Sequence, residues 1–163
     1  MAIREIVPKG AEVLRKKCAL VSDVNSASVR KVIRDLVHTL EHVKTLHDFK
    51  RGVGLAAPQI GTPLRISVVE YGGKRHVLIN PEIVEKSEEK KPIKEGCLSF
   101  FEFRAHVPRH EYVKIKAQNE QGETFHLEGR NDFAMLLQHE LDHLDGVLYM
   151  DHLPRGEKEL FRA

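Results

Sequence analysis

The stretch Gln138-His-Glu-Leu-Asp-His143 has the pattern His-Glu-x-x-His and lies in an apolar run near the C-terminus. In a helix of about 3.6 residues per turn, His139 and His143 lie on one face, one turn apart. Two imidazoles placed in this way can bind one metal ion, and Glu140 can take a proton from a water molecule that the metal activates. The other interpretation is a solvated helix face. The surrounding leucines favour a buried helix, whose polar side chains need partners such as a metal ion.

The length and composition indicate a soluble globular protein. The chain has 163 residues, so we expect one domain over residues 1–163. The net charge of +2 is too small to indicate nucleic acid or an anionic membrane as the main partner. No apolar run is long enough for a membrane span, and the first residues lack the pattern of a secretory signal. Two cysteines do not indicate a disulfide framework, so we expect a cytoplasmic protein.

The hydrophobic pattern predicts an α+β fold. Apolar residues recur every three or four positions from Val29 to Leu46, which is typical of an amphipathic helix of about 20 residues, with Ser26 or Ser28 as its N-cap. A second helix carries the His-Glu-x-x-His motif and should run to about Leu144, with Asn131 or Asp132 as its expected N-cap. We expect mixed or antiparallel sheets packed around this central C-terminal helix, which carries the His-Glu-x-x-His motif. Alternating residues predict strands at 64–71, 76–84, 111–117 and 123–127, a bend or edge at Pro81, and a last short helix over 156–162.

A second unusual stretch runs from Arg51 to Gly61 and places three glycines, two alanines and a proline around Gln59. Glycine lets a backbone approach a ligand closely, and the Gln59 amide can donate a hydrogen bond into the space beside it. The other interpretation is a tight helix-to-strand connection without chemistry.

A third stretch, Ile93–Ser99, contains Cys97 beside Gly96. A lone cysteine is usually a small core residue. However, two histidines leave a catalytic metal in need of a third ligand, and a thiolate binds zinc or ferrous iron strongly. We therefore predict Cys97, His139 and His143 as the metal ligands.

These three stretches resemble the signature motifs of peptide deformylase. They are Gly52-Val-Gly-Leu-Ala-Ala-Pro-Gln59, Glu95-Gly-Cys-Leu-Ser99 and Gln138-His-Glu-Leu-Asp-His143, in the family's order and at similar spacing. The resemblance covers nearly the whole chain and is greatest to the bacterial type I form. One position departs from the family pattern, in which an apolar residue and then a proline follow Glu-Gly-Cys-Leu-Ser. Here Phe101 stands in place of that proline.

The resemblance implies a metal-dependent hydrolase that removes the formyl group from the N-terminal formyl-methionine of newly made polypeptides and releases formate. It implies one divalent metal ion per chain. In the family this ion is usually ferrous iron, and zinc, nickel or cobalt can substitute for it. Glu140 would act as the general base. The Gln59 amide and the backbone N–H of Leu98 would stabilise the oxyanion.

The resemblance also implies how the peptide binds. It would lie as an added strand along Gly52–Leu55, with backbone bonds from Gly54 and Gly96. The implied substrate-binding residues are Gly52, Val53, Gly54, Ile93, Gly96, Arg104, Met135 and Leu136. The implied partners are nascent formyl-methionine polypeptides, with the ribosome as a further candidate, and neither a nucleic-acid site nor a membrane contact is expected.

Two polar residues of the motif helix are candidates for supporting the metal ligands, Gln138 and Asp142. Asp142 could orient a ligating imidazole through its free N–H.

Two rival functions remain open. One is a zincin-type metallopeptidase with Glu157 or Glu159 as the third ligand. The other is a non-enzymatic module in which the metal only holds the fold. It would need a closed site of four protein ligands, and the sequence offers no clear fourth ligand.

Overall fold

The computed structural model describes residues 2–163, so Met1, with which the predicted domain begins, lies outside the described residues. Within that range the chain forms two α-helices, α1 (Ala27–Leu46) and α2 (Asp132–Leu144), and eight strands. The strands are β1 (Val53–Ala56), β2 (Ile66–Tyr71), β3 (Lys74–Lys86), β4 (Lys90–Glu95), β5 (Phe103–His110), β6 (Tyr112–Gln118), β7 (Thr124–Arg130) and β8 (Phe161–Arg162).

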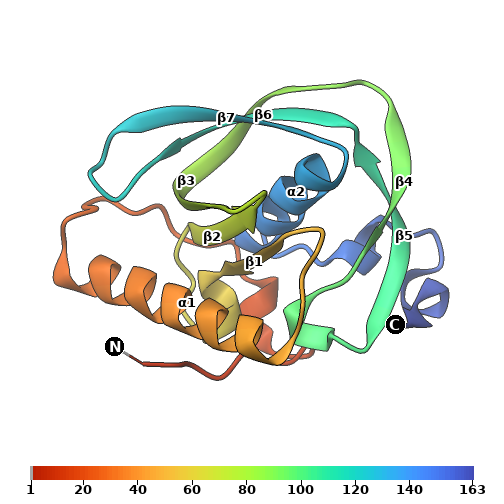
Figure 1. The fold of residues 1–163 in the computed structure, drawn as a ribbon, viewed down its shortest axis with the longest axis horizontal. Coiled ribbons are helices and arrows are strands. Elements are labelled where there is room, and N and C mark those ends of the chain that lie inside the picture. Colours follow the sequence, from red (N-terminus) through yellow and green to blue (C-terminus); the bar gives the residue numbers. More distant parts are fainter. Residues whose placement is uncertain (1) are drawn as a thin grey trace.

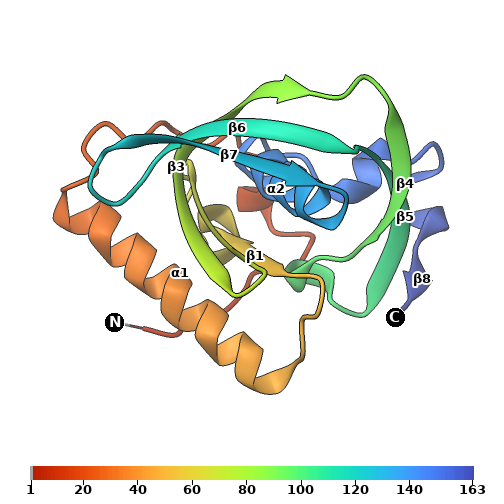
Figure 2. The ribbon, with the colours of Figure 1, turned by 45° about the horizontal axis from the view of Figure 1, so that its top comes forward.

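The strands form two antiparallel sheets around α2. In the part of the chain from residue 2 onward, one sheet has the order β1-β2-β3-β6-β7 and the other has the order β4-β5-β8. Figures 1 and 2 show α2 in the interior, with β6 and β7 arching over it and with β4 and β5 to one side, while α1 lies along the outside. The prediction of an α+β fold with a central motif-bearing helix is confirmed.

The first helix forms as its sequence predicts. The hydroxyl of Ser26 accepts a hydrogen bond from the N–H of Val29 at 3.3 Å, which satisfies one of the free N–H groups at the start of α1. The apolar side chains of Val29, Ile33, Leu36 and Leu40 form one buried stripe that packs against the residues of β1 and β2.

The second helix is buried along nearly its whole length. Eleven of its side chains, from Phe133 to Leu144, are buried against both sheets. Asn131 occupies the N-cap position, as predicted, but its side chain makes no capping bond and its φ is +52°. Four polar residues of α2 are also buried, and each of them needs a specific partner: Gln138, His139, Glu140 and His143.

Two further predictions concern the bend at Pro81 and the last helix. The chain bends at Asn80-Pro81, where Asn80 has a φ of +51° and the pairing of β3 with β6 shifts in register, so the predicted bend at Pro81 is confirmed. The predicted helix over residues 156–162 is wrong. Gly156–Glu159 is a single 3-10 turn, and the next residues pair with β5 as β8. Among residues 2–163, no helix is both long and apolar enough to cross a membrane.

A buried carboxylate ties α1 to the N-terminal segment. Asp35 is 1% exposed and accepts hydrogen bonds from the N–H of Ala2, the guanidinium of Arg4 and the ammonium of Lys31. Burial raises the pKa of Asp35, but the hydrogen bonds from Lys31, Ala2 and Arg4 outweigh it and hold the pKa below its ordinary value. The charged form is therefore the one that the folded state stabilises.

We expect Asp35→Asn to lower the free energy of unfolding at pH 7 by about 1–3 kcal/mol, because three donors lose a charged acceptor. A carboxyl whose pKa is lower in the folded state stabilises the protein above its unfolded pKa of about 3.9 and loses that effect as the pH falls. The difference between the two proteins should therefore shrink from pH 7 to pH 3 in urea unfolding. The control is Glu157→Gln, since Glu157 pairs with Lys9 at the surface. Equal urea midpoints at pH 7 would contradict this role of Asp35.

Candidate metal centre

Three buried side chains from two parts of the chain meet at α2. His139 and His143 lie one turn apart on the helix, and Cys97 follows the end of β4. The Nε2 atoms of the two histidines are 3.1 Å apart, and the Cys97 Sγ lies 3.4 Å from the Nε2 of His143. All three ligand atoms lie within 4.8 Å of one another. The prediction that these three residues form one metal-binding group is confirmed.

The donor set fits a divalent metal ion. Ligands at about 2.1–2.3 Å around a tetrahedral ion are roughly 3.4–3.6 Å apart, close to the separations found here. Burial lowers the pKa of His143, which favours the neutral imidazole that a metal ligand must be. Three protein ligands leave a position open for a reacting group, which is typical of catalytic sites and not of structural ones.

A buried ion pair orients the first histidine. The Nδ1–H of His139 donates to the Oε1 of Glu95 at 2.7 Å, which leaves the Nε2 free to face the other ligands. Arg109 donates to both oxygens of the Glu95 carboxylate, at 2.8 and 2.7 Å. Burial raises the pKa of Glu95, but the bonds from Arg109 outweigh it and hold the pKa at about 2. Glu95 is therefore ionised and accepts from the imidazole.

This arrangement corrects two predictions. Asp142 does not bond to a ligating imidazole. Its Oδ2 instead accepts from Arg109 at 2.7 Å and lies 2.8 Å from the Nε2 of His152. Adjacent residues of a helix point in different directions, so Asp142 faces away from the side that His143 presents to the metal. Gln138 bonds to the backbone of His110 and joins α2 to β5, so it supports the helix and contacts no ligand atom.

Glu140 is buried in a pocket next to β1 and β2. It is 1% exposed, and the hydroxyl of Ser67 donates to its Oε2 at 2.9 Å. Burial raises the pKa of Glu140 to about 7, although the charge of His139 and the bond from Ser67 act to lower it. A carboxylate whose pKa is close to neutrality can both accept and return a proton, as a general base must.

Gln59 lies in the buried 3-10 turn Ala57–Ile60, next to Cys97. Its amide oxygen accepts from the N–H of Ala56 at 2.9 Å, which turns the NH₂ group toward Cys97 Sγ at 3.6 Å and Ser99 Oγ at 3.2 Å. Leu98 begins the 3-10 turn Leu98–Phe100, and N–H groups at the start of such a turn have no partner within it. The Gln59 NH₂ group and the Leu98 N–H are therefore donors next to Cys97.

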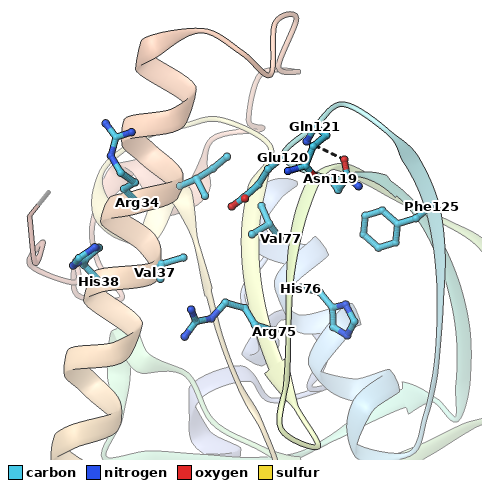
Figure 3. A pocket seen from close by; sticks show the side chains of 11 residues that line it. Arg34, Val37, His38, Arg75, His76, Val77, Asn119, Glu120, Gln121 and Phe125 are labelled. Atoms are coloured by element: carbon cyan, nitrogen blue, oxygen red, sulfur yellow. Dashed lines mark hydrogen bonds between the residues drawn. The ribbon is translucent and has the colours of Figure 1, made fainter.

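A cavity of about 340 Å³ opens onto these residues. Of the predicted site residues, the cavity is lined by Gly52, Val53, Gly54, Gly96, Cys97, Leu98, Arg104, Met135, Leu136, His139 and Glu140. Gln59, Ile93 and His143 are not among the residues that line it. Gln59 and His143 are buried behind the lining, whereas the side chain of Ile93 is only half-buried in β4. A larger cavity of about 610 Å³ lies between α1, β3 and the β6–β7 hairpin, where Val37 and Val77 face it (Figure 3). It contains none of the metal-binding residues, so the smaller cavity is the candidate site.

Two residues that orient a metal ligand were not predicted from the sequence, Glu95 and Arg109. Glu95 was part of the third stretch, but its bond to His139 depends on how β4 packs against α2. Arg109 carried a usable signal, because it follows Ala105 and Val107 as the third inward residue of an alternating strand. A charged residue at a core position indicates a buried partner.

The rival ligand sets are wrong. Glu157 is exposed and pairs with Lys9, while Glu159 accepts from the N–H of Arg155. In residues 2–163, the His, Cys, Asp and Glu side chains that converge as a metal-binding group are Cys97, His139 and His143.

Gly54 lies against the carboxyl group of Glu140. A β-carbon at this position would lie 2.8 Å from the carboxyl carbon and from the Oε1 of Glu140, closer than atoms can pack. We expect Gly54→Ala to displace Glu140. The kcat/KM for the hydrolysis expected from the sequence should then fall by about 10²-fold, the effect typical of a misplaced reacting group. The metal content, measured by atomic absorption, should not change. Gly10→Ala is the control, since no atom lies within 4 Å of a β-carbon there. Unchanged kcat/KM in Gly54→Ala would contradict this packing.

Comparison with known proteins places the chain among enzymes with the same organisation. Residues 3–159 match the family model described as polypeptide deformylase. The chain is 43% identical to the peptide deformylase of Heliobacterium modesticaldum over 98% of this chain and 99% of that one. The crystal structure of a Legionella pneumophila peptide deformylase is 38% identical, with a TM-score of 0.85 over 96% of this chain and 90% of that chain. A Met-Ala-Ser-bound structure of the class I type b enzyme from Acinetobacter baumannii is 29% identical, with a TM-score of 0.82 over 93% and 99%.

Proposed function

The chain belongs to the polypeptide deformylase family, and from this premise we propose how its own residues perform the reaction. It is a hydrolase that removes the formyl group from the N-terminal formyl-methionine of polypeptides, and it carries the Cys97–His139–His143 metal site. The observation that carries the proposal is the position of Glu140, which is buried beside these three ligands and lines the same cavity.

We propose that the site holds ferrous iron, with zinc, nickel or cobalt as substitutes, because two imidazoles and one thiolate suit all of these ions. When bound, the ion supplies Lewis-acid activation of a water molecule. Glu140 accepts a proton from the water whose oxygen attacks the formyl carbon. It delivers that proton to the amine nitrogen as the carbon–nitrogen bond breaks, so that formate and the free amine are released. The Gln59 NH₂ group and the N–H of Leu98 donate hydrogen bonds to the carbonyl oxygen as negative charge develops on it, and each such donor is typically worth about 10²–10³ in kcat.

We propose that the peptide lies along β1 as an added strand and bonds to the backbone of Gly54 and Gly96. The relative from Acinetobacter baumannii holds Met-Ala-Ser, which supports a peptide of this kind as the ligand here. The methionine side chain lies against Val53, Met135 and Leu136, which line the cavity next to the metal-binding residues. The remaining implied contacts are those of Gly52, Ile93 and Arg104.

We further propose that residues 1–163 act as one catalytic domain in the cytoplasm, where formyl-methionine chains are made, and that the enzyme works on them beside the ribosome. The proposal needs no contact with nucleic acid, in keeping with the small net charge of +2.

The test is formate release from formyl-Met-Ala-Ser by protein that is purified without oxygen, with Cys97→Ala alongside. We expect the wild type to bind one divalent ion per chain and to release formate. Cys97→Ala should lose the bound ion and the activity together, because a catalytic ion cannot be held by two imidazoles alone. A Cys97→Ala protein that keeps its metal and its activity would overturn the proposed ligand set. Metal-loaded wild type that releases no formate would overturn the function.

A further inference from the structure

Phe101 is the residue at which this chain departs from its family's motif, and it forms part of an aromatic cluster. Its ring centroid lies 4.4 Å from that of His47 and 6.0 Å from that of Phe49. His47 and Phe49 also contact each other, at 6.2 Å between centroids. A proline at position 101 would have no aromatic ring with which to form this cluster.

The cluster joins the two sides of the active-site cleft. His47 is the C-cap residue of α1 and Phe49 lies in the loop that leads to β1, which forms one side. Phe101 follows the 3-10 turn after Cys97 and belongs to the other side. Figures 1 and 2 show the segment between β4 and β5 reaching toward the loop that follows α1. Because Phe49 and Phe101 line the cavity that Cys97 and His139 also line, we expect a peptide bound there to meet their rings.

Arg104 fixes the position of the Phe101 ring. Its Nη1 donates to the carbonyl oxygens of Phe101 and Phe103, at 2.6 and 2.8 Å, and its guanidinium carbon lies 5.0 Å from the centroid of the Phe101 ring. Arg104 also packs against Gly96, where a β-carbon would lie 2.6 Å from its Nη1. These bonds hold the backbone and the ring of Phe101 in place before a peptide arrives, which lowers the entropic cost of binding.

Phe49 and Phe101 line the same cavity as the metal-binding residues. At about 340 Å³ this cavity is near the lower end of the range of about 300–1,000 Å³ that is usual for ligand sites. Formyl-methionine therefore occupies much of it, and the side chain that follows the methionine meets the aromatic rings.

We propose that Phe101, together with Phe49, makes this deformylase select formyl-methionine peptides whose second or third residue is apolar or aromatic. This inference rests on the proposed function and names the substrate class of the same site. Aromatic rings in a partly dry cleft gain from stacking with an apolar side chain, and they offer no partner to a carboxylate.

The charges at the rim of the cleft would favour the opposite class. Lys50, Arg51, Lys94 and Arg104 line the cavity together with Asp48, and attraction to the four cations alone would select acidic peptides. However, Arg51 already pairs with Asp132 at 2.7 Å, and Arg104 already donates to two backbone carbonyl oxygens. The two lysines are exposed, where their attraction is weak and screened by salt. Phe49 and Phe101 are half-buried, so we expect these two rings to dominate.

The experiment compares kcat/KM for peptides that differ in one residue after formyl-methionine. The pairs are formyl-Met-Phe-Ser with formyl-Met-Asp-Ser, and formyl-Met-Ala-Phe with formyl-Met-Ala-Asp. We expect the wild type to prefer the phenylalanine peptide of at least one pair by about tenfold or more, as one apolar contact can provide. Phe101→Ala and Phe101→Pro should reduce that preference to about twofold, measured as the ratio of the two kcat/KM values within each variant.

Phe103→Ala is the matched control, since Phe103 lies outside the cavity and packs against Arg162. It should keep the wild-type preference. Calorimetry gives the dissociation constants of Met-Phe-Ser and Met-Asp-Ser for the wild type, which depend on the same cleft but not on the chemical step. We expect Met-Phe-Ser to bind more tightly. Retained formate release with equal or reversed preference, or an unchanged preference in both Phe101 variants, would overturn the proposal and leave the deformylase function intact.

Discussion

Glu140→Gln should lower kcat for formate release by about 10²–10⁴-fold, the usual contribution of a positioned general base. Glutamine has nearly the same shape as glutamate and can still accept the hydrogen bond from Ser67, so the fold should not change. It cannot accept a proton from water, however, and it cannot deliver one to the departing amine. The chemical step therefore loses the group that moves the proton at both stages.

The measurement pairs steady-state formate release with metal analysis of the same samples. Glu140 is not among the residues whose ligand atoms converge, so the variant should bind one ion per chain like the wild type. Glu88→Gln changes an exposed carboxylate in the turn between β3 and β4 and should retain full activity. Should Glu140→Gln keep more than a tenth of the wild-type kcat, another group must move the proton.

Arg109→Ala should be the most destabilising single change near the site, with a loss of about 3–5 kcal/mol in the free energy of unfolding. Arg109 is 3% exposed, and its removal leaves the buried carboxylate of Glu95 without a counter-charge. Burial then raises the pKa of Glu95, and a protonated Glu95 accepts only a weaker, uncharged hydrogen bond from the imidazole of His139. We expect metal affinity to fall by about 10–100-fold as a result, the usual cost of losing a group that orients a ligand.

Two measurements separate these effects. Urea unfolding of the metal-free protein gives the change in the free energy of unfolding, and competition with a chelator gives the change in metal affinity. Arg162→Ala is the control, because the Arg162–Glu102 pair is exposed on both sides and should contribute little. Arg109→Lys should fall between the two, since a lysine cannot bond to both oxygens of Glu95 in the same geometry. An Arg109→Ala protein as stable as Arg162→Ala would show that Glu95 finds another partner.

The sequence by itself determined the elements and residues whose signals are local. The period of α1 and its Ser26 cap predicted the helix correctly, because both depend on residues a few positions apart. The spacing of His139 and His143 was enough to place two ligands on one helix face, and the need for a third ligand pointed to Cys97. The resemblance of three ordered motifs to one family then gave the activity.

Only the tertiary structure decided which polar residues support the ligands. Asp142 is next to a ligand in the sequence but points away from it, whereas Glu95 orients His139 across 44 positions of the chain. The bond between Arg109 and Glu95 depends on the register of β4 and β5, and the aromatic cluster of Phe101 depends on where α1 ends relative to that sheet. Such contacts join segments that are distant in sequence, and their partners are fixed by the packing of a close-filled core, which no local pattern encodes.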